Sequence, residues 1–326
     1  MGVKGFKAAD SEAGAPWTAR SLGSAFQHNI FYALIRFGGR EGAYVLLLFV
    51  VAWYVLLRPL VRKRSRFYLR RRFPRSNPFQ RLWQCYRLCL ALGQVLVDRA
   101  VLGILGSDRL DCRLTGWEQL RALLGEGHGL ILVTAHVGSW QVGMASLEQL
   151  ETSVSLLIHR EEGDVDRHFY EHGPGAAPYR FIDPLGYLGG TLEMLQVLNK
   201  GEVLCIMGDR VMGGRSSRLS VAFLGGPVAV PFSPYKLASA TGAPIAVIFP
   251  HKSGHDRYVL QVARIIRVPG NLGRSQDAYR PYAVQFLEAL EAFVQDHPFQ
   301  FFNFFDMWTD PPPRDPEPSP WIPKPD

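Results

Sequence analysis

His136 follows a short apolar run in the stretch ILVTAHVGSWQ, which begins at Ile131. The run predicts a buried strand at residues 129–135, because consecutive apolar residues bounded by glycine are typical of strands in parallel sheets. A histidine directly after such a strand lies at the carboxyl edge of the sheet, where α/β proteins usually build their sites. Gly138 allows close approach of a ligand or another segment, and Ser139 can cap the helix that follows. An isolated histidine could equally be held by the backbone of a turn, so the rest of the chain has to decide its role.

Short apolar runs and helical patterns alternate from residue 111 onward. We expect strands at residues 129–135, 153–159, 179–183, 202–208, 219–224, 244–249 and 258–266. Helical patterns separate several of them, at residues 140–150, 187–199, 234–240 and 278–295. The alternation predicts an α/β fold over residues 111–310, with a mixed, largely parallel central sheet flanked by helices. The last sixteen residues hold eight prolines and predict an extended tail at 311–326.

The N-terminal third carries the basicity of the chain. Nine cations fall between Arg58 and Arg75, in eighteen residues without an Asp or Glu, and without them the net charge of +7 would be −2. The fifteen residues before this run, from Ala43 to Leu57, are uncharged and carry Tyr and Trp toward their ends. An apolar helix with aromatic margins and an arginine-rich flank is typical of a membrane anchor whose basic side faces the cytoplasm and anionic lipid.

The apolar stretch is shorter than the roughly 20 residues that a full span requires. A tilted, half-inserted or interfacial helix therefore stays open, and so does a core helix of the folded domain. The resulting organisation has a loose segment at residues 1–28, a hydrophobic membrane-anchoring region at 29–61, and a basic and amphipathic helical region at 62–110.

Three segments resemble the lauroyl and myristoyl acyltransferases of lipid A biosynthesis, within the glycerolipid acyltransferase superfamily. The superfamily carries an H-x-x-x-x-acid pattern. In this chain His136 matches the histidine of that pattern, and Gln141 stands at the position of the acid. Residues 201–249 match the family's G-E-hydrophobic run, an Asp, a glycine-containing linker, a V-x-F strand and a Pro-led helix ending in A-x-x-T-G-A-P. Residues 297–308, HPFQFFNFFDMW, are similar to its late P-x-Q-aromatic segment. The likeness covers almost the whole chain, and the three segments lie in the family's order.

The resemblance implies transfer of a fatty acyl group from an acyl carrier protein thioester to a hydroxyl of a membrane-embedded lipid, at the cytoplasmic face of the inner membrane. The implied partners are acyl carrier protein, an acceptor such as a lipid A precursor or related glycolipid, and the anionic membrane surface. No cofactor is implied beyond the acyl donor. Attack of a hydroxyl on a thioester needs a general base with a pKa near neutral, which histidine provides. Nucleic acid is not an expected partner, because the cations cluster beside an apolar helix rather than across a sheet face.

Gln141 departs from the family's pattern, in which an acid at this place orients the imidazole and stabilises its charged form. A glutamine amide can accept a hydrogen bond from the ring but carries no charge, and losing that charge in a Ser-His-Asp triad costs about 10⁴ in turnover. Asp209 is the substitute that we favour, because it follows the strand expected at 202–208 and would lie at the same sheet edge. An ion pair with Arg210 or a structural cap is its competing role. Without a compensating carboxylate, the chain would be either a slow enzyme or a degenerate relative that binds lipid or acyl carrier protein without transfer.

Four arginines are candidate ligands for substrate phosphate. Arg160 follows the strand expected at 153–159 and corresponds to an arginine of the family. Arg210, Arg215 and Arg218 surround a glycine pair and could bind the phosphopantetheine phosphate or a lipid phosphate. A solvated surface position is the competing interpretation for each arginine. The four cysteines form no C-x-x-C pair, so we expect neither disulfides nor a metal site, as is typical of a reducing compartment.

Overall fold

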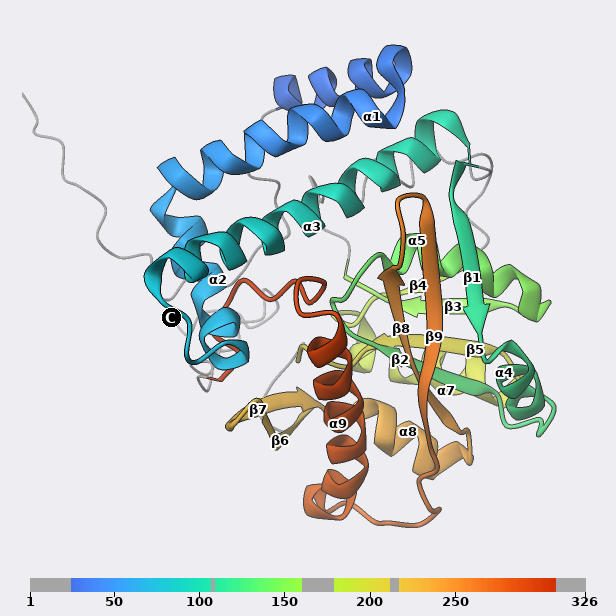
Figure 1. Cartoon of the computed structure of the whole chain (residues 1–326). Coiled ribbons are helices and arrows are strands. Elements are labelled where there is room, and N and C mark those ends of the chain that lie inside the picture. The colour runs from blue at the N-terminus through green and yellow to red at the C-terminus, as the bar shows by residue number, and fades with distance from the viewer. Residues whose placement is uncertain (1–24, 107–108, 160–178, 212–216, 309–326) are drawn as a thin grey trace, which may run out of the picture.

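A computed structural model of the chain describes residues 25–106, 109–159, 179–211 and 217–308. Seven strands form one sheet in the order β1-β9-β8-β2-β5-β3-β4 (Figure 1). Neighbouring strands are parallel except β8 and β9, so the prediction of a mixed, largely parallel sheet is confirmed. The elements of this domain are β1 (Asp111–Thr115), α4 (Trp117–Leu124), β2 (Leu130–Thr134), α5 (Trp140–Ala145), η2 (Ser146–Leu150), β3 (Val154–Leu157), β4 (Tyr179–Ile182), η3 (Tyr187–Gly190), α7 (Thr191–Asn199), β5 (Val203–Met207), β6 (Arg218–Phe223), β7 (Gly226–Pro231), α8 (Ser233–Thr241), β8 (Ile245–Lys252), β9 (Arg257–Ile266), η5 (Gln276–Tyr279) and α9 (Arg280–Asp296).

All seven expected strands form, with small shifts at their ends. The strand expected at 219–224 lies outside the main sheet, because β6 pairs only with β7 in a separate antiparallel hairpin. The sequence patterns do not predict β1, β7 or α4. β1 reads DCRLT and is an edge strand with partly exposed side chains, so it lacks the apolar run of a central strand. β7 carries prolines at its second and last residues, and proline normally argues against a strand.

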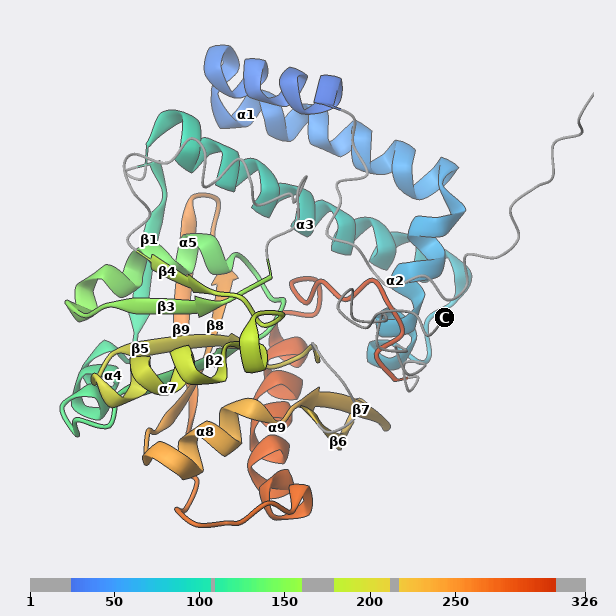
Figure 2. The same ribbon diagram turned by 180° about the vertical axis from the view of Figure 1, so that it is seen from behind.

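The central strands have both faces buried. Every residue of β2 is buried, and alternate side chains enter two different cores. Ile131 and Val133 belong to the core that includes Phe286 and Leu290 of α9, whereas Leu132 belongs to a second core that includes Leu120 of α4. α7, α8 and α9 thus cover one face of the sheet, and α4 and α5 lie on the other (Figure 2). This arrangement leaves the carboxyl edge of the sheet for the loops that follow the strands.

Three helices precede the sheet domain: α1 (Ala25–Leu57), α2 (Pro59–Arg72) and α3 (Pro78–Leu105). α1 is interrupted at Gly39, where a φ of 65° and a ψ of −169° are accessible essentially only to glycine, and the chain folds back there (Figures 1 and 2). α3 lies between α1 and the sheet domain. The structure describes α1 from Ala25, so residues 25–28 of the segment expected to be loose at 1–28 are helical. Residues 1–24 and the tail expected at 311–326 lie outside the described residues.

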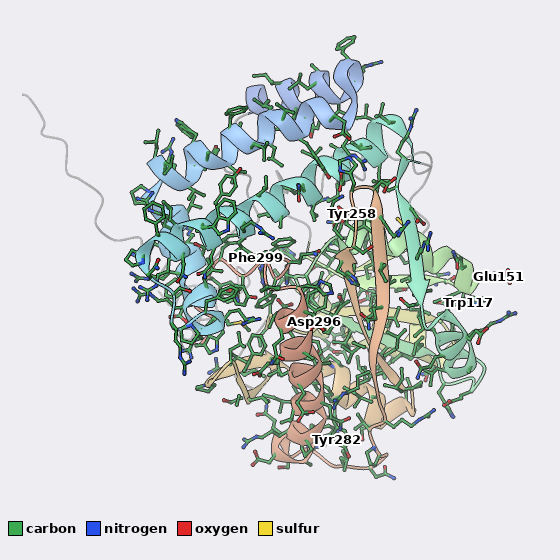
Figure 3. All side chains as sticks on the ribbon, viewed as in Figure 1. Trp117, Glu151, Tyr258, Tyr282, Asp296 and Phe299 are labelled. Atoms are coloured by element: carbon green, nitrogen blue, oxygen red, sulfur yellow. The ribbon has the colours of Figure 1, made fainter. Side chains whose placement is uncertain are left out.

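The aromatic segment at residues 297–308 joins the helices to the sheet domain. Phe301 is fully buried and packs edge-on against Tyr68 of α2 and Phe223 of β6. The Tyr68 hydroxyl donates to the Pro298 carbonyl over 2.7 Å, and Trp308 Nε1 donates to the Phe223 carbonyl over 2.8 Å. Phe299, labelled in Figure 3, lies between α3 and the end of α9. The segment therefore lies where α2, β6 and the sheet domain meet.

Candidate active site

His136 and Asp209 meet at the carboxyl edge of the sheet. They follow β2 and β5, which are adjacent parallel strands with Thr134 opposite Met207. Each residue lies two positions beyond its strand, so the two loops bring them to the same level. His136 Nδ1 lies 2.9 Å from Oδ1 and 3.0 Å from Oδ2 of Asp209. Nε2 is the ring nitrogen that does not face the carboxylate, and the His136 side chain is 27% exposed, so the ring is accessible from solvent.

Glycines allow both loops to pack closely. Gly138 has a φ of +48°, and a Cβ at this position would lie 2.0 Å from the Pro250 carbonyl oxygen. A Cβ at Gly208 would lie 2.6 Å from a methyl group of Val133. The Gly208 amide donates to the Thr134 carbonyl over 2.7 Å, which ties the end of β5 to the end of β2. Side chains other than glycine would push the His136 loop off the sheet edge.

The aromatic C-terminal segment holds the His136 loop from its other side. The Phe302 amide donates to the His136 carbonyl over 2.8 Å, and the Gly138 amide donates to the Gln300 carbonyl over 2.9 Å. Gln300 in turn forms two hydrogen bonds with the backbone of Lys252 in β8. These positioning contacts escape sequence reasoning, although the P-x-Q-aromatic likeness marks the segment that makes them.

The Asp209 carboxylate is buried, with 2% of the side chain exposed. Burial by itself would raise the pKa of this carboxyl group. The His136 imidazole and the Arg210 guanidinium more than offset that effect, so the pKa of Asp209 lies below its ordinary value. A buried anion beside Nδ1 can fix the imidazole tautomer and stabilise the imidazolium, which is the part that the aspartate plays in a Ser-His-Asp triad.

Gln141, where the sequence resemblance implies an acid, lies at the start of α5 and is 3% exposed. The carboxylate that contacts His136 therefore comes from the loop after β5 instead of from α5. Ser139 caps α5 as expected, with its hydroxyl 3.4 Å from the Val142 amide. The structure thus brings together two of the three predicted chemical groups, His136 and Asp209, and places Gln141 on the neighbouring helix.

Arg210 lies beside Asp209 on the same loop. Its guanidinium is 5.1 Å from the ring centre of Phe305, and Nη2 lies 3.5 Å from the Phe302 carbonyl. Burial lowers the pKa of Arg210 to about 10, with Asp209 acting in the opposite direction. Arg218 begins β6, opposite Pro231. Arg160 and Arg215 lie outside the described residues.

A small apolar cavity of about 50 Å³ lies beneath α5, on the face of the sheet opposite α9. Trp140 and Gly143 of α5 form part of its wall, and Thr134, two residues before His136, lines it as well. The other walls come from apolar side chains of β2, β3, β5, β8 and β9. The cavity is a further feature that the sequence patterns do not predict, because it requires the order of the strands.

No group of three or more His, Cys, Asp or Glu side chains that could hold a metal ion occurs within the described ranges. A pair of stacked imidazoles does lie at this end of the sheet. His251 of β8 stacks on His297 at the end of α9, with ring centres 4.2 Å apart. Burial, and secondarily the neighbouring His297, lowers the pKa of His251 to about 4.

Comparison with known proteins agrees with the sequence likeness. Residues 20–309 match the family described as bacterial lipid A biosynthesis acyltransferase. Phosphatidylinositol mannoside acyltransferases from two strains of Mycobacterium tuberculosis are 29% identical over 147 residues, which are 41% of this chain and 42% of each relative. The alignment thus spans less than half the length of these relatives.

The resemblance to a solved structure is weak. A 1-acyl-sn-glycerophosphate acyltransferase from Thermotoga maritima has a TM-score of 0.34 and 13% identity, with coverage of 79% of this chain and 98% of that one. The family match covers most of the chain and includes every element that builds the site. The protein belongs to the bacterial lipid A biosynthesis acyltransferase family.

Proposed function

We propose that the protein transfers a fatty acyl group from an acyl carrier protein thioester to a hydroxyl group of a membrane lipid, with His136 as general base. The contact of His136 Nδ1 with the Asp209 carboxylate carries this proposal. Asp209 supplies the negative charge that Gln141 lacks, from the loop that follows β5 at the same edge of the sheet.

In the proposed reaction, Nε2 of His136 takes the proton of the acceptor hydroxyl as its oxygen attacks the thioester carbonyl carbon. A tetrahedral intermediate forms and collapses, the carbon–sulfur bond breaks, and the imidazolium returns the proton to the departing thiolate. Asp209 accepts a hydrogen bond from Nδ1–H throughout and stabilises the imidazolium, so its contribution is largest when the ring is charged. Products are an ester and a free thiol, and no redox partner is needed.

The cavity beneath α5 supports an acyl group as the transferred unit. Its walls are almost entirely apolar, and Thr134 places it within two residues of His136 along the chain. The acceptor that we propose is a lipid A precursor or a related glycolipid, since the family acts in lipid A biosynthesis and the relatives from Mycobacterium tuberculosis are named for a mannosylated phosphatidylinositol. Of the two predicted arginines that the structure describes, Arg210 and Arg218, the candidate that we favour for contact with a substrate phosphate is Arg210, because it lies beside Asp209.

The inner membrane, with the sheet domain on its cytoplasmic face, is the proposed location. Support comes from the apolar helix α1, from the acid-free basic helix α2 that follows it, and from the general retention of basic flanks on the cytoplasmic side.

The first experiment measures transfer of radiolabelled acyl groups from acyl carrier protein to total membrane lipid. The native protein should label a lipid and His136→Ala should not. His128→Ala is the matched control, because His128 is exposed at the opposite end of β2 and should keep native activity. The labelled lipid then identifies the acceptor. No label with the native protein, across every candidate acceptor, would remove the proposal.

Gln141 favours one alternative, a degenerate relative that binds lipid or acyl carrier protein without transfer. Gln141→Glu restores the family's acid and separates the two functions. An enzyme should keep or gain rate in this variant, whereas a binding protein should show none in either form.

A further inference from the structure

Two helices among the described residues are long and apolar enough to cross a membrane, at Ile30–Leu57 and Pro78–Leu105. The break at Gly39 divides the first of them. The segment after the break starts with Arg40 and Glu41, and its uncharged part runs for sixteen residues from Gly42 to Leu57. At about 1.5 Å per residue this part is roughly 24 Å long, whereas the apolar core of a bilayer is about 30 Å thick. The uncharged part of α1 is therefore shorter than a full span.

A buried polar cluster fastens α1 and α3 to the sheet domain. Asp98 of α3 is fully buried, and three groups from other elements donate to its carboxylate. They are the Tyr44 hydroxyl of α1 at 2.6 Å, the Lys252 ammonium of β8 at 2.6 Å and the Tyr258 hydroxyl of β9 at 2.5 Å. Figure 3 shows Tyr258 at the end of the β8–β9 hairpin that reaches α3. Neither helix can enter the bilayer core without taking this charged cluster and the hairpin with it, which is prohibitively costly in hydrocarbon.

One side of α1 is nevertheless apolar and exposed. Ala43, Leu47, Val51 and Val55 face inward and are buried. The opposite side, which we term the outer stripe, consists of Val45, Leu48, Phe49, Trp53, Leu56 and Leu57, each between 43% and 69% exposed. An exposed apolar row of this length on a soluble surface marks an interaction site.

The flank of the outer stripe is cationic. Arg58 lies over the ring of Trp53, 5.3 Å from its centre, so a charge adjoins the stripe directly. Arg62 instead donates to the last carbonyls of α1, at Val55 and Leu56, and closes the end of that helix. Lys63, Arg66 and Arg70 are exposed along α2, which contains no acid. The positive charge of Arg66 lowers the pKa of Arg70, because neighbouring cations disfavour each other.

We propose that α1 lies in the interface of an anionic bilayer, with the outer stripe among the upper acyl carbons and the cations of α2 on lipid phosphates. Both ends of α1, α3 and the sheet domain then stand on one side of the membrane. This position of α1 in the membrane interface does not depend on acyl transfer. Its test measures membrane topology instead of activity, so either proposal can be refuted without the other.

The test uses the full chain with one epitope tag at each end, reconstituted into vesicles of phosphatidylethanolamine and phosphatidylglycerol and treated with protease from outside. With α1 in the interface, molecules that lose the C-terminal tag also lose the N-terminal tag. An N-terminal tag that stays protected until detergent is added, in molecules whose C-terminal tag is gone, would overturn the proposal.

A matched pair of substitutions tests the surface itself. Phe49→Glu places a charge in the outer stripe at a side chain that is 69% exposed, and Leu192→Glu does so on α7 at one that is 51% exposed. Phe49→Glu should lower the bound fraction on phosphatidylglycerol vesicles about tenfold or more, because membrane affinity scales with buried apolar area. Leu192→Glu should bind like the native protein. Equal binding by native protein and Phe49→Glu, with both folded by circular dichroism, would also overturn the proposal.

Discussion

Neutralising Asp209 tests the proposed chemistry most directly. In Asp209→Asn, the amide replaces a carboxylate oxygen that lies 2.9 Å from His136 Nδ1. Two unit charges at that separation, with an effective dielectric constant of about 20, interact by about 6 kcal/mol. The interaction exists only while the imidazole is protonated, so its loss raises the barrier and leaves the resting enzyme largely unchanged. At about 1.4 kcal/mol per decade, we expect kcat to fall roughly 10⁴-fold, with KM little affected.

The assay is single-turnover transfer from labelled acyl carrier protein, with native protein, Asp209→Asn and His136→Ala measured together. Thermal unfolding must accompany it, because Asp209→Asn also removes the acid beside the Arg210 guanidinium, and the assay temperature has to lie below the unfolding transition of each variant. A rate for Asp209→Asn within tenfold of native, beside an inactive His136→Ala, would refute the assignment of Asp209.

The double variant Asp209→Asn/Gln141→Glu moves the acid back to the family's position. If the imidazole needs a carboxylate and tolerates either source, the double variant should recover part of the rate that Asp209→Asn loses. No recovery, with a folded protein, would mean that the α5 position no longer reaches the ring in this chain.

Three further predictions concern stability and are read from urea unfolding. Gly138→Ala should cost at least about 2–3 kcal/mol, because its Cβ would collide with backbone, whereas Gly127→Ala, also at positive φ but with nothing within 4 Å, should cost about 1 kcal/mol or less; equal costs would contradict the close packing of the loop. Asp98→Asn should cost about 3–5 kcal/mol by leaving the buried Lys252 ammonium without its counterion, and Asp98→Asn/Lys252→Met should recover part of it. The pKa of His251 is about 4 in the folded protein, whereas that of a free histidine is about 6.5, so the unfolded chain binds the proton first as the pH falls. Neutral His251 therefore contributes fully to the free energy of unfolding above pH 6.5, and this contribution is lost as the pH falls toward 4. The native protein should therefore lose about 1–2 kcal/mol more than His251→Phe over that range, after allowance for solvent screening, and parallel curves would contradict this.

Local sequence patterns predict the buried strands and some close contacts. The apolar run of β2 predicts a buried strand, and Gly138 predicts a close approach of another segment. β1 gives no such signal, because an edge strand with half-exposed side chains needs no apolar run. The Asp98 cluster is equally invisible, since its four members come from α1, α3, β8 and β9, and only the folded chain shows that an aspartate in an apolar helix has a lysine partner.

The order of the strands in the sheet explains why Asp209 lies beside His136. Sequence order alone would place β3 next to β2, because most consecutive strands are neighbours. In the structure β5 is inserted between them, with Cys205 opposite Leu132 on one side and Leu156 on the other. Counting four residues on from these partners reaches His136, Asp209 and Arg160 in the sequence. If β3 lay beside β2 in the same register, the loop after β3 would bring an arginine, instead of an aspartate, next to His136. An arginine would repel a positively charged imidazole. The insertion of β5 is thus what gives this histidine a carboxylate, from a different loop than the one that leads to Gln141.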